Sequence, residues 1–121
     1  NRMEKAGIPV EDRFLDALVF PIGAGSEFGK HFLNACKSIR DKYGDGVHIF
    51  GGFSNVSFGL PNRRLINETL AMLSILHGCD SMMIDPKQIN VKKLIEFKLA
   101  ADALLGKDEY CMKMIEYMRA Q

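Results

Sequence analysis

The feature that most constrains the fold of this chain is an alternation of short apolar runs with longer amphipathic patterns. The apolar runs cover residues 13–20, 47–50 and 81–84, and the patterns with apolar residues three and four apart cover 27–43, 65–77 and 91–105. Strands that alternate with helices in this way form parallel sheets through right-handed crossovers. The pattern therefore predicts an α/β protein with about three βα units, in which residues 81–84 form a short buried strand, followed by a final helix that starts at Asp108.

The length of the repeating unit points to a particular α/β architecture. Each unit spans about 35 residues, as in a (β/α)8 barrel, but three units cannot close a barrel of eight strands. A sheet of three parallel strands would also leave both edges open. We therefore expect residues 1–121 to be the C-terminal portion of a TIM (β/α)8 barrel domain, with residues 1–6 as the end of a preceding helix. The alternative is a small self-contained three-layer domain.

Composition excludes several classes of protein. Hydrophobic residues make up 47% and charged residues 26%, which is typical of soluble globular proteins. The net charge of +1 gives no reason to expect nucleic acid or membrane as a partner. No signal peptide or membrane span is predicted, and a cytoplasmic location is expected. The cysteines and histidines lack the spacing of a zinc site or a disulfide framework, so reduced thiols and no metal are expected.

A long loop follows the second apolar run. From Phe50 to Arg63 it reads Phe-Gly-Gly-Phe-Ser-Asn-Val-Ser-Phe-Gly-Leu-Pro-Asn-Arg. Connections in compact domains are mostly about 2–6 residues long, and loops after strands lie on the ligand-binding face of α/β proteins. This loop is therefore predicted to form a binding site.

Two aspartates stand at the apolar runs. Asp16 interrupts the first run, where a carboxylate is costly unless it is paired or bound to a ligand. An ion pair with Arg13 or a lysine and a contact with a ligand are both open interpretations. Asp85 precedes Pro86 after the third run and is better explained as a turn or capping residue.

The loop and its surroundings resemble the pterin-binding methyltransferases. The family pattern is Gly-x-Ser-Asn-Val/Ile-Ser-x-Gly-x-x-x-Arg followed by Leu-Ile/Leu-Asn, and residues 52–67 match it. Residues 15–21 (Leu-Asp-Ala-Leu-Val-Phe-Pro) and 101–105 (Ala-Asp-Ala-Leu-Leu) match further segments in the same order. The family has a dihydropteroate-synthase-like TIM barrel. It includes methyltetrahydrofolate:corrinoid protein methyltransferases and the folate module of cobalamin-dependent methionine synthase.

The resemblance implies a reaction and the residues that serve it. The barrel would hold methyltetrahydrofolate, or tetrahydromethanopterin, and pass its N5 methyl group to the Co(I) corrinoid (cobalamin) of a partner. It implies Asn55 as the catalytic residue, bonded at N5, and Asp16 as acceptor for the 2-amino pyrimidine edge. Ser54 is implied at the pterin, Gly52 as the residue that lets the backbone approach its flat ring, and Arg63 at the benzoyl-glutamate tail. Taken alone, Asn55, Ser54 and Ser57 are equally consistent with turn residues, and Arg63 with a solvated surface arginine.

The resemblance also implies partners. These are a corrinoid iron–sulfur protein or a cobalamin domain, the N-terminal half of the barrel, and a second copy in a homodimer. Because the N-terminal half carries further pterin ligands, this segment alone is expected to be inactive. Two alternatives stay open: a dihydropteroate-synthase-like enzyme, although residues 81–86 lack the Arg and His of that family, and a non-catalytic subunit that binds a pterin or a corrinoid protein.

Overall fold

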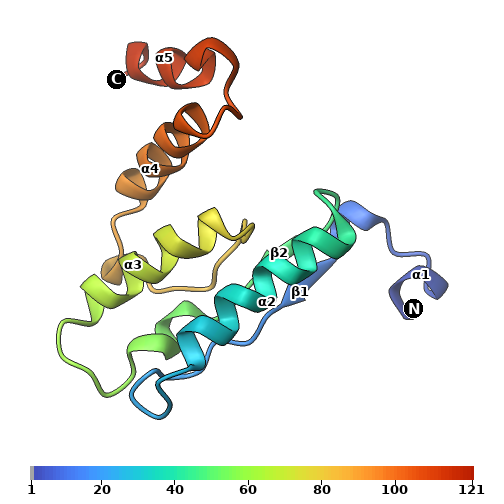
Figure 1. Ribbon diagram of the computed structural model, residues 1–121, viewed down its shortest axis with the longest axis vertical. Helices are drawn as coiled ribbons and strands as arrows, with labels where there is room; N and C mark the ends of the chain where they lie inside the picture. The colour runs from blue at the N-terminus through green and yellow to red at the C-terminus, as the bar shows by residue number, and fades with distance from the viewer. Residues whose placement is uncertain (1) are drawn as a thin grey trace. The chain divides into compact units, whose positions relative to one another are not determined.

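The computed structural model describes residues 2–121, which form two compact units divided between Ile89 and Asn90 (Figure 1). The larger unit contains, in order, α1 (Arg2–Lys5), η1 (Val10–Asp12), β1 (Phe14–Asp16), α2 (Phe28–Tyr43), β2 (His48–Phe50), η2 (Phe53–Ser57), α3 (Arg63–Leu76) and η3 (Pro86–Gln88). The smaller unit contains α4 (Val91–Leu104), η4 (Glu109–Cys111) and α5 (Met112–Arg119). The α/β class is confirmed, and so is the predicted order of elements except for the third strand, which is not formed as a regular strand.

The sheet is parallel and follows chain order. β1 pairs in parallel with one edge of β2, and the Phe50 carbonyl at this edge accepts a hydrogen bond from the Ala17 amide at 3.2 Å. On the other side, the Gly51 carbonyl accepts a hydrogen bond from the Met83 amide at 3.0 Å. The third apolar run therefore lies against the far edge of β2, so that β2 is central.

Both outer strands are shorter than predicted. The first run leaves the sheet after Asp16 because Leu18 adopts a left-handed backbone with φ of 63°. The third run makes a single parallel bridge, between Gly52 and Met83, and the Met83 side chain is 69% exposed. The prediction of a buried third strand is wrong, because no described residue covers the sheet face on which Met83 lies.

The core lies on one face of the sheet only. Ile49 points to the helical side and is fully buried, while α2 packs against β2 and contacts α3. Phe32 of α2 and Phe53 of η2 meet edge to face with ring centroids 5.4 Å apart. The opposite face carries Phe14, which is half exposed. Helices on one face are compatible with one wall of a barrel, whereas doubly wound sheets carry helices on both faces.

Arg40 of α2 links three segments that lie at the ends of helices and strands. Its guanidinium donates hydrogen bonds to the carbonyls of Gly44, Val47 and Gly78, at distances from 2.7 to 3.1 Å. These groups follow α2, precede β2 and follow α3, respectively. Arg40 therefore ties together the amino ends of β2 and of the segment that follows α3, at the end of the sheet opposite the carboxyl ends of the strands.

The smaller unit is a helical hairpin. The predicted helix 91–105 corresponds to α4, but the last helix starts at Met112 rather than at Asp108. Tyr110 and Cys111 both have left-handed backbones, which separates η4 from α5, and the buried Asp108 carboxylate accepts hydrogen bonds from the amides of Lys113 and Met114. None of the helices in residues 2–121 combines the length and apolar character needed to cross a membrane.

Candidate functional site

A cavity of about 560 Å³ lies at the carboxyl ends of the strands. The ends of β1 and β2, the loops after them and the third extended segment contribute its lining residues: Asp16, Leu18, Val19, Phe20, Pro21, Phe50, Gly52, Asn55, Phe58 and Met83. The structure thus brings Asp16, Gly52 and Asn55 together in one cavity, although the first lies far from the others in the sequence.

Asp16 is the last residue of β1 and its carboxylate shapes the turn that follows. Its Oδ1 accepts a hydrogen bond from the Leu18 amide at 2.8 Å, which supports the left-handed conformation of Leu18. Arg13, one of the candidate ion-pair partners, instead donates to the Ile8 carbonyl from Nε and Nη2, at 3.1 and 2.8 Å. No other described residue bonds the exposed carboxylate, so Oδ2 is available to a donor in the cavity.

Asn55 lies in the short helical turn η2 and its side chain folds back over Gly52. The turn itself is made by the backbone, since the Asn55 amide donates to the Gly52 carbonyl and the Phe58 amide donates to the Asn55 carbonyl. A Cβ atom on Gly52 would stand 3.3 Å from Asn55 Nδ2. The exposed carboxamide has no hydrogen-bond partner among residues 2–121, so both of its ends are available in the cavity.

Ser54 and Arg63 do not line this cavity. Arg63 Nη2 donates to the Ser54 carbonyl at 2.6 Å, and Arg63 Nε donates to Ser57 Oγ at 2.9 Å. Ser57 is fully buried and donates to Asn67 Oδ1, so its side chain serves the loop. The binding of substrate by Ser54 and Arg63 stays a prediction. Asp85 accepts a hydrogen bond from the Lys87 amide at 2.9 Å, which confirms its interpretation as a capping residue.

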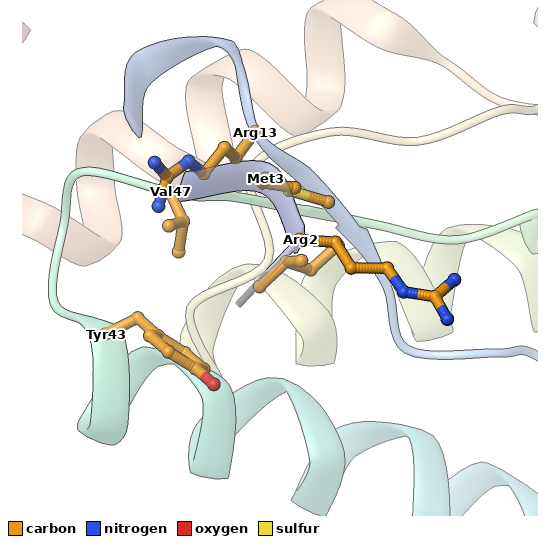
Figure 2. A pocket seen from close by; sticks show the side chains of 6 residues that line it. Arg2, Met3, Arg13, Tyr43 and Val47 are labelled. Carbon is orange, nitrogen blue, oxygen red and sulfur yellow. The ribbon is translucent and has the colours of Figure 1, made fainter. Parts of the chain in front are cut away.

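Other hollows lie in the larger unit, and two of them contrast with this cavity. One, of about 290 Å³, lies at the amino ends of the strands, and Figure 2 shows Tyr43 and Val47 on its wall with Arg2 turned away. The other, of about 660 Å³, lies between α2 and α3 and is lined mainly by aliphatic side chains. Ligands in parallel α/β sheets bind at the carboxyl ends of the strands. Among these hollows, only the cavity at that end brings a carboxylate and a carboxamide together.

The titratable groups with shifted pKa values lie away from the cavity. His48 Nδ1 stands 2.7 Å from Asp80 Oδ2, and this hydrogen bond raises the pKa of His48. The Cys36 thiol is buried against Cys79, and its hydrogen bond to Cys79, together with burial, raises its pKa. All three cysteines are free thiols. The contact between Cys36 and Cys79 is one that linear spacing could not reveal.

An α/β unit with a cavity at the carboxyl ends of its parallel strands, lined by apolar side chains with one carboxylate and one carboxamide, has the arrangement of a ligand-binding α/β protein. No family model matches the chain. Over 105 residues, 87% of its length, the chain is 36% identical to the methylcorrinoid:tetrahydrofolate methyltransferase of Eubacterium limosum. The match covers 37% of that protein, so the chain spans little more than a third of this relative. The similarity supports the resemblance to pterin-binding methyltransferases as a partial match.

Proposed function

We propose that this chain is the C-terminal portion of a (β/α)8-barrel methyltransferase. The enzyme moves a methyl group between N5 of a tetrahydropterin, such as methyltetrahydrofolate, and the corrinoid of a partner protein. The observation that carries the proposal is the convergence of Asp16 and Asn55, from separate βα units, on one cavity at the strand ends. The similarity to a methyltransferase over 87% of the chain supports the same assignment.

The cavity suits a reduced pterin in size and chemistry. Its volume of about 560 Å³ falls in the range of small-molecule sites, which are mostly apolar with a few polar groups. Phe50, Phe58 and Met83 offer apolar surface to a flat ring system. The free Oδ2 of Asp16 is an acceptor, which suits the donor-rich 2-amino pyrimidine edge of a pterin.

Asn55 would act at the nitrogen that carries the methyl group. A tertiary amine is a poor methyl donor because its leaving group would be an anion, whereas a proton at N5 lets a neutral amine leave. The Asn55 carboxamide can accept a hydrogen bond from a protonated N5 or donate one to its lone pair. A bond that strengthens as charge shifts lowers the barrier, and removing one such group costs about 10²–10³ in rate.

The same contact serves both directions of transfer. The name of the Eubacterium limosum relative describes transfer from a methylcorrinoid to tetrahydrofolate. In that direction the N5 lone pair would form the bond to carbon, the electron pair of the broken cobalt–carbon bond would stay on the corrinoid as Co(I), and the proton that N5 carried would be released to solvent. Because forward and reverse reactions share one transition state, Asn55 would hold N5 in the same way in each.

The open sheet suggests what completes the enzyme. The outer edge of β1 is unpaired among the described residues, and Phe14 and Met83 expose apolar surface on the uncovered face. Exposed strand edges are templates for pairing. We propose that further βα units cover this face and edge as the N-terminal half of the barrel. A corrinoid iron–sulfur protein or cobalamin domain would dock at the mouth, and a second copy would form a homodimer.

A chimera tests the proposal. The 105 matched residues of this chain would replace the corresponding segment of the Eubacterium limosum enzyme. We expect this chain alone to be inactive, and the chimera to transfer methyl groups between a methylcorrinoid and tetrahydrofolate. Asn55→Ala should lower that rate by about 10²–10³, whereas the matched control Asn34→Ala, on the exposed surface of α2, should not. An active chimera whose rate is unaffected by Asn55→Ala would contradict the proposal.

A further inference from the structure

A buried chain of hydrogen bonds lies directly behind the loop that carries Asn55. Ser57 Oγ donates to Asn67 Oδ1 at 2.7 Å, and Asn67 Nδ2 donates to Gln88 Oε1 at 2.9 Å. Arg63 Nε donates to Ser57 Oγ at 2.9 Å. Ser57 and Asn67 are both fully buried, so each polar group is satisfied within the protein rather than by solvent.

The hydrogen-bond partners of Asn67 determine the orientation of its side-chain amide, with Oδ1 toward Ser57 and Nδ2 toward Gln88. The Ser57 hydroxyl has one proton, which it gives to Asn67 Oδ1 while it accepts from Arg63. The other end of the amide then donates to Gln88. An apolar residue would be the default at this buried position of α3. A buried asparagine destabilises the fold unless its side-chain amide is hydrogen-bonded. Here both the oxygen and the nitrogen of the Asn67 amide have a hydrogen-bond partner.

The network reaches Asn55 from both sides. Ser57 follows Asn55 by two positions, and the Ser54 carbonyl, directly before Asn55, accepts a hydrogen bond from Arg63 Nη2 at 2.6 Å. The turn η2 has only five residues and no side-chain cap of its own, and short 3₁₀ turns have poor internal hydrogen-bond geometry. Its conformation therefore depends on partners outside the turn, and Asn67 is the residue that links them to α3 and η3.

We propose that Asn67 is a positioning residue for Asn55: through Ser57 and Arg63 it holds η2 so that the Asn55 carboxamide lies over Gly52 and lines the cavity. The consequence for catalysis rests on the proposed function: a displacement of the Asn55 carboxamide by about 1 Å can lower the rate by about 10². The placement of Asn55 by Asn67 is a structural claim, and it can be tested without substrate.

The test is an NMR measurement on the full chain. One Hα of Gly52 takes the direction of the Cβ that would stand 3.3 Å from Asn55 Nδ2, so the side-chain amide protons of Asn55 should show a nuclear Overhauser effect to it. We expect Asn67→Ala to weaken this signal by about threefold or more, because the effect falls steeply with distance and small displacements suffice. Ile49→Val, a core change that lowers stability without touching the network, should leave it unchanged.

A second variant covers the case in which Asn67→Ala does not fold. Ser57→Ala removes the hydroxyl through which Asn67 contacts η2, and it deletes a single side-chain atom. An undiminished signal in folded Asn67→Ala, or in Ser57→Ala if the first variant is unfolded, would overturn the inference. Addition of 5-methyltetrahydrofolate separates this inference from the proposed function. If the Overhauser signal depends on Asn67 but the resonances of the cavity residues do not shift with this ligand, the inference stands and the proposed function is contradicted.

Discussion

Asn55 Nδ2 lies 3.3 Å from the position that a Cβ atom on Gly52 would occupy. The carboxamide therefore rests on a residue that has no side chain, and Gly52 leaves the space in which Asn55 is placed. Gly52 has a φ of −81°, which any L-residue can adopt, so the requirement for glycine here is steric rather than conformational.

This contact predicts the effect of Gly52→Ala. The new methyl group should push the Asn55 amide by a few tenths of an ångström, and we expect methyl transfer by the chimera to fall by about tenfold or more. The free energy of unfolding should change by less than about 1 kcal/mol, because the backbone of Gly52 suits alanine. Gly29→Ala in α2 is the control, and it should keep the rate and raise stability by about 0.5–1 kcal/mol. A fully active Gly52→Ala enzyme would show that the contact is unimportant.

The role of Asp16 can be tested by a substitution that keeps one of its two side-chain oxygens and removes the negative charge. In Asp16→Asn the side-chain oxygen can still accept from the Leu18 amide, so the turn with φ of 63° at Leu18 is kept. The charged acceptor for the pterin is lost, and hydrogen bonds to charged groups contribute about 1.5–3 kcal/mol. We expect tetrahydropterin affinity to fall by about 10- to 100-fold, as measured by calorimetry on the chimera, with an unchanged unfolding midpoint. Unchanged affinity would exclude Asp16 from the site.

The pair of His48 and Asp80 predicts a pH dependence of stability. The hydrogen bond to Asp80 raises the pKa of His48 in the folded state above its usual value of about 6.5. A raised folded pKa means that this stabilisation is fully present below about pH 6.5 and is lost as the pH rises through the folded pKa. The unfolding midpoint of the wild type should therefore decrease over this range, and His48→Gln should remove that part of the decrease. His31→Gln is the control, and a decrease that survives in His48→Gln would assign the effect to another group.

Sequence periodicity was sufficient for the order of elements but not for the length of the strands. The spacing of apolar residues predicts α2, α3 and α4 because a helix repeats its core face every three or four residues. The first strand ends early because the Asp16 carboxylate accepts a hydrogen bond from the Leu18 amide. The pattern of apolar residues gives no indication of such a local hydrogen bond. The exposure of Met83 depends on what covers the sheet, and periodicity carries no information about that.

The candidate site was predictable where it follows from topology and unpredictable where it depends on side-chain contacts. The resemblance to pterin-binding methyltransferases implied that Asp16 and Asn55 contact the same ligand. They line one cavity because the carboxyl ends of parallel strands share one edge. The bonds of Arg63 to Ser54 and Ser57 depend on how the loop folds, and nothing in the spacing of residues 54–63 indicates them. Asn67 could have been noticed as an amide on the apolar face of a predicted helix, a position where an amide needs partners.

The central claim is that Asp16 and Asn55 hold a reduced pterin in one cavity, and an NMR titration of the isotope-labelled chain with 5-methyltetrahydrofolate tests it most directly. The account predicts shifts at Asp16, Gly52 and the Asn55 side-chain amide, with little change in the hollow between α2 and α3. It also predicts that Asn55→Ala weakens the response while Asn34→Ala does not. Shifts confined to the groove between α2 and α3, or no response at the strand ends at millimolar ligand, would contradict the account.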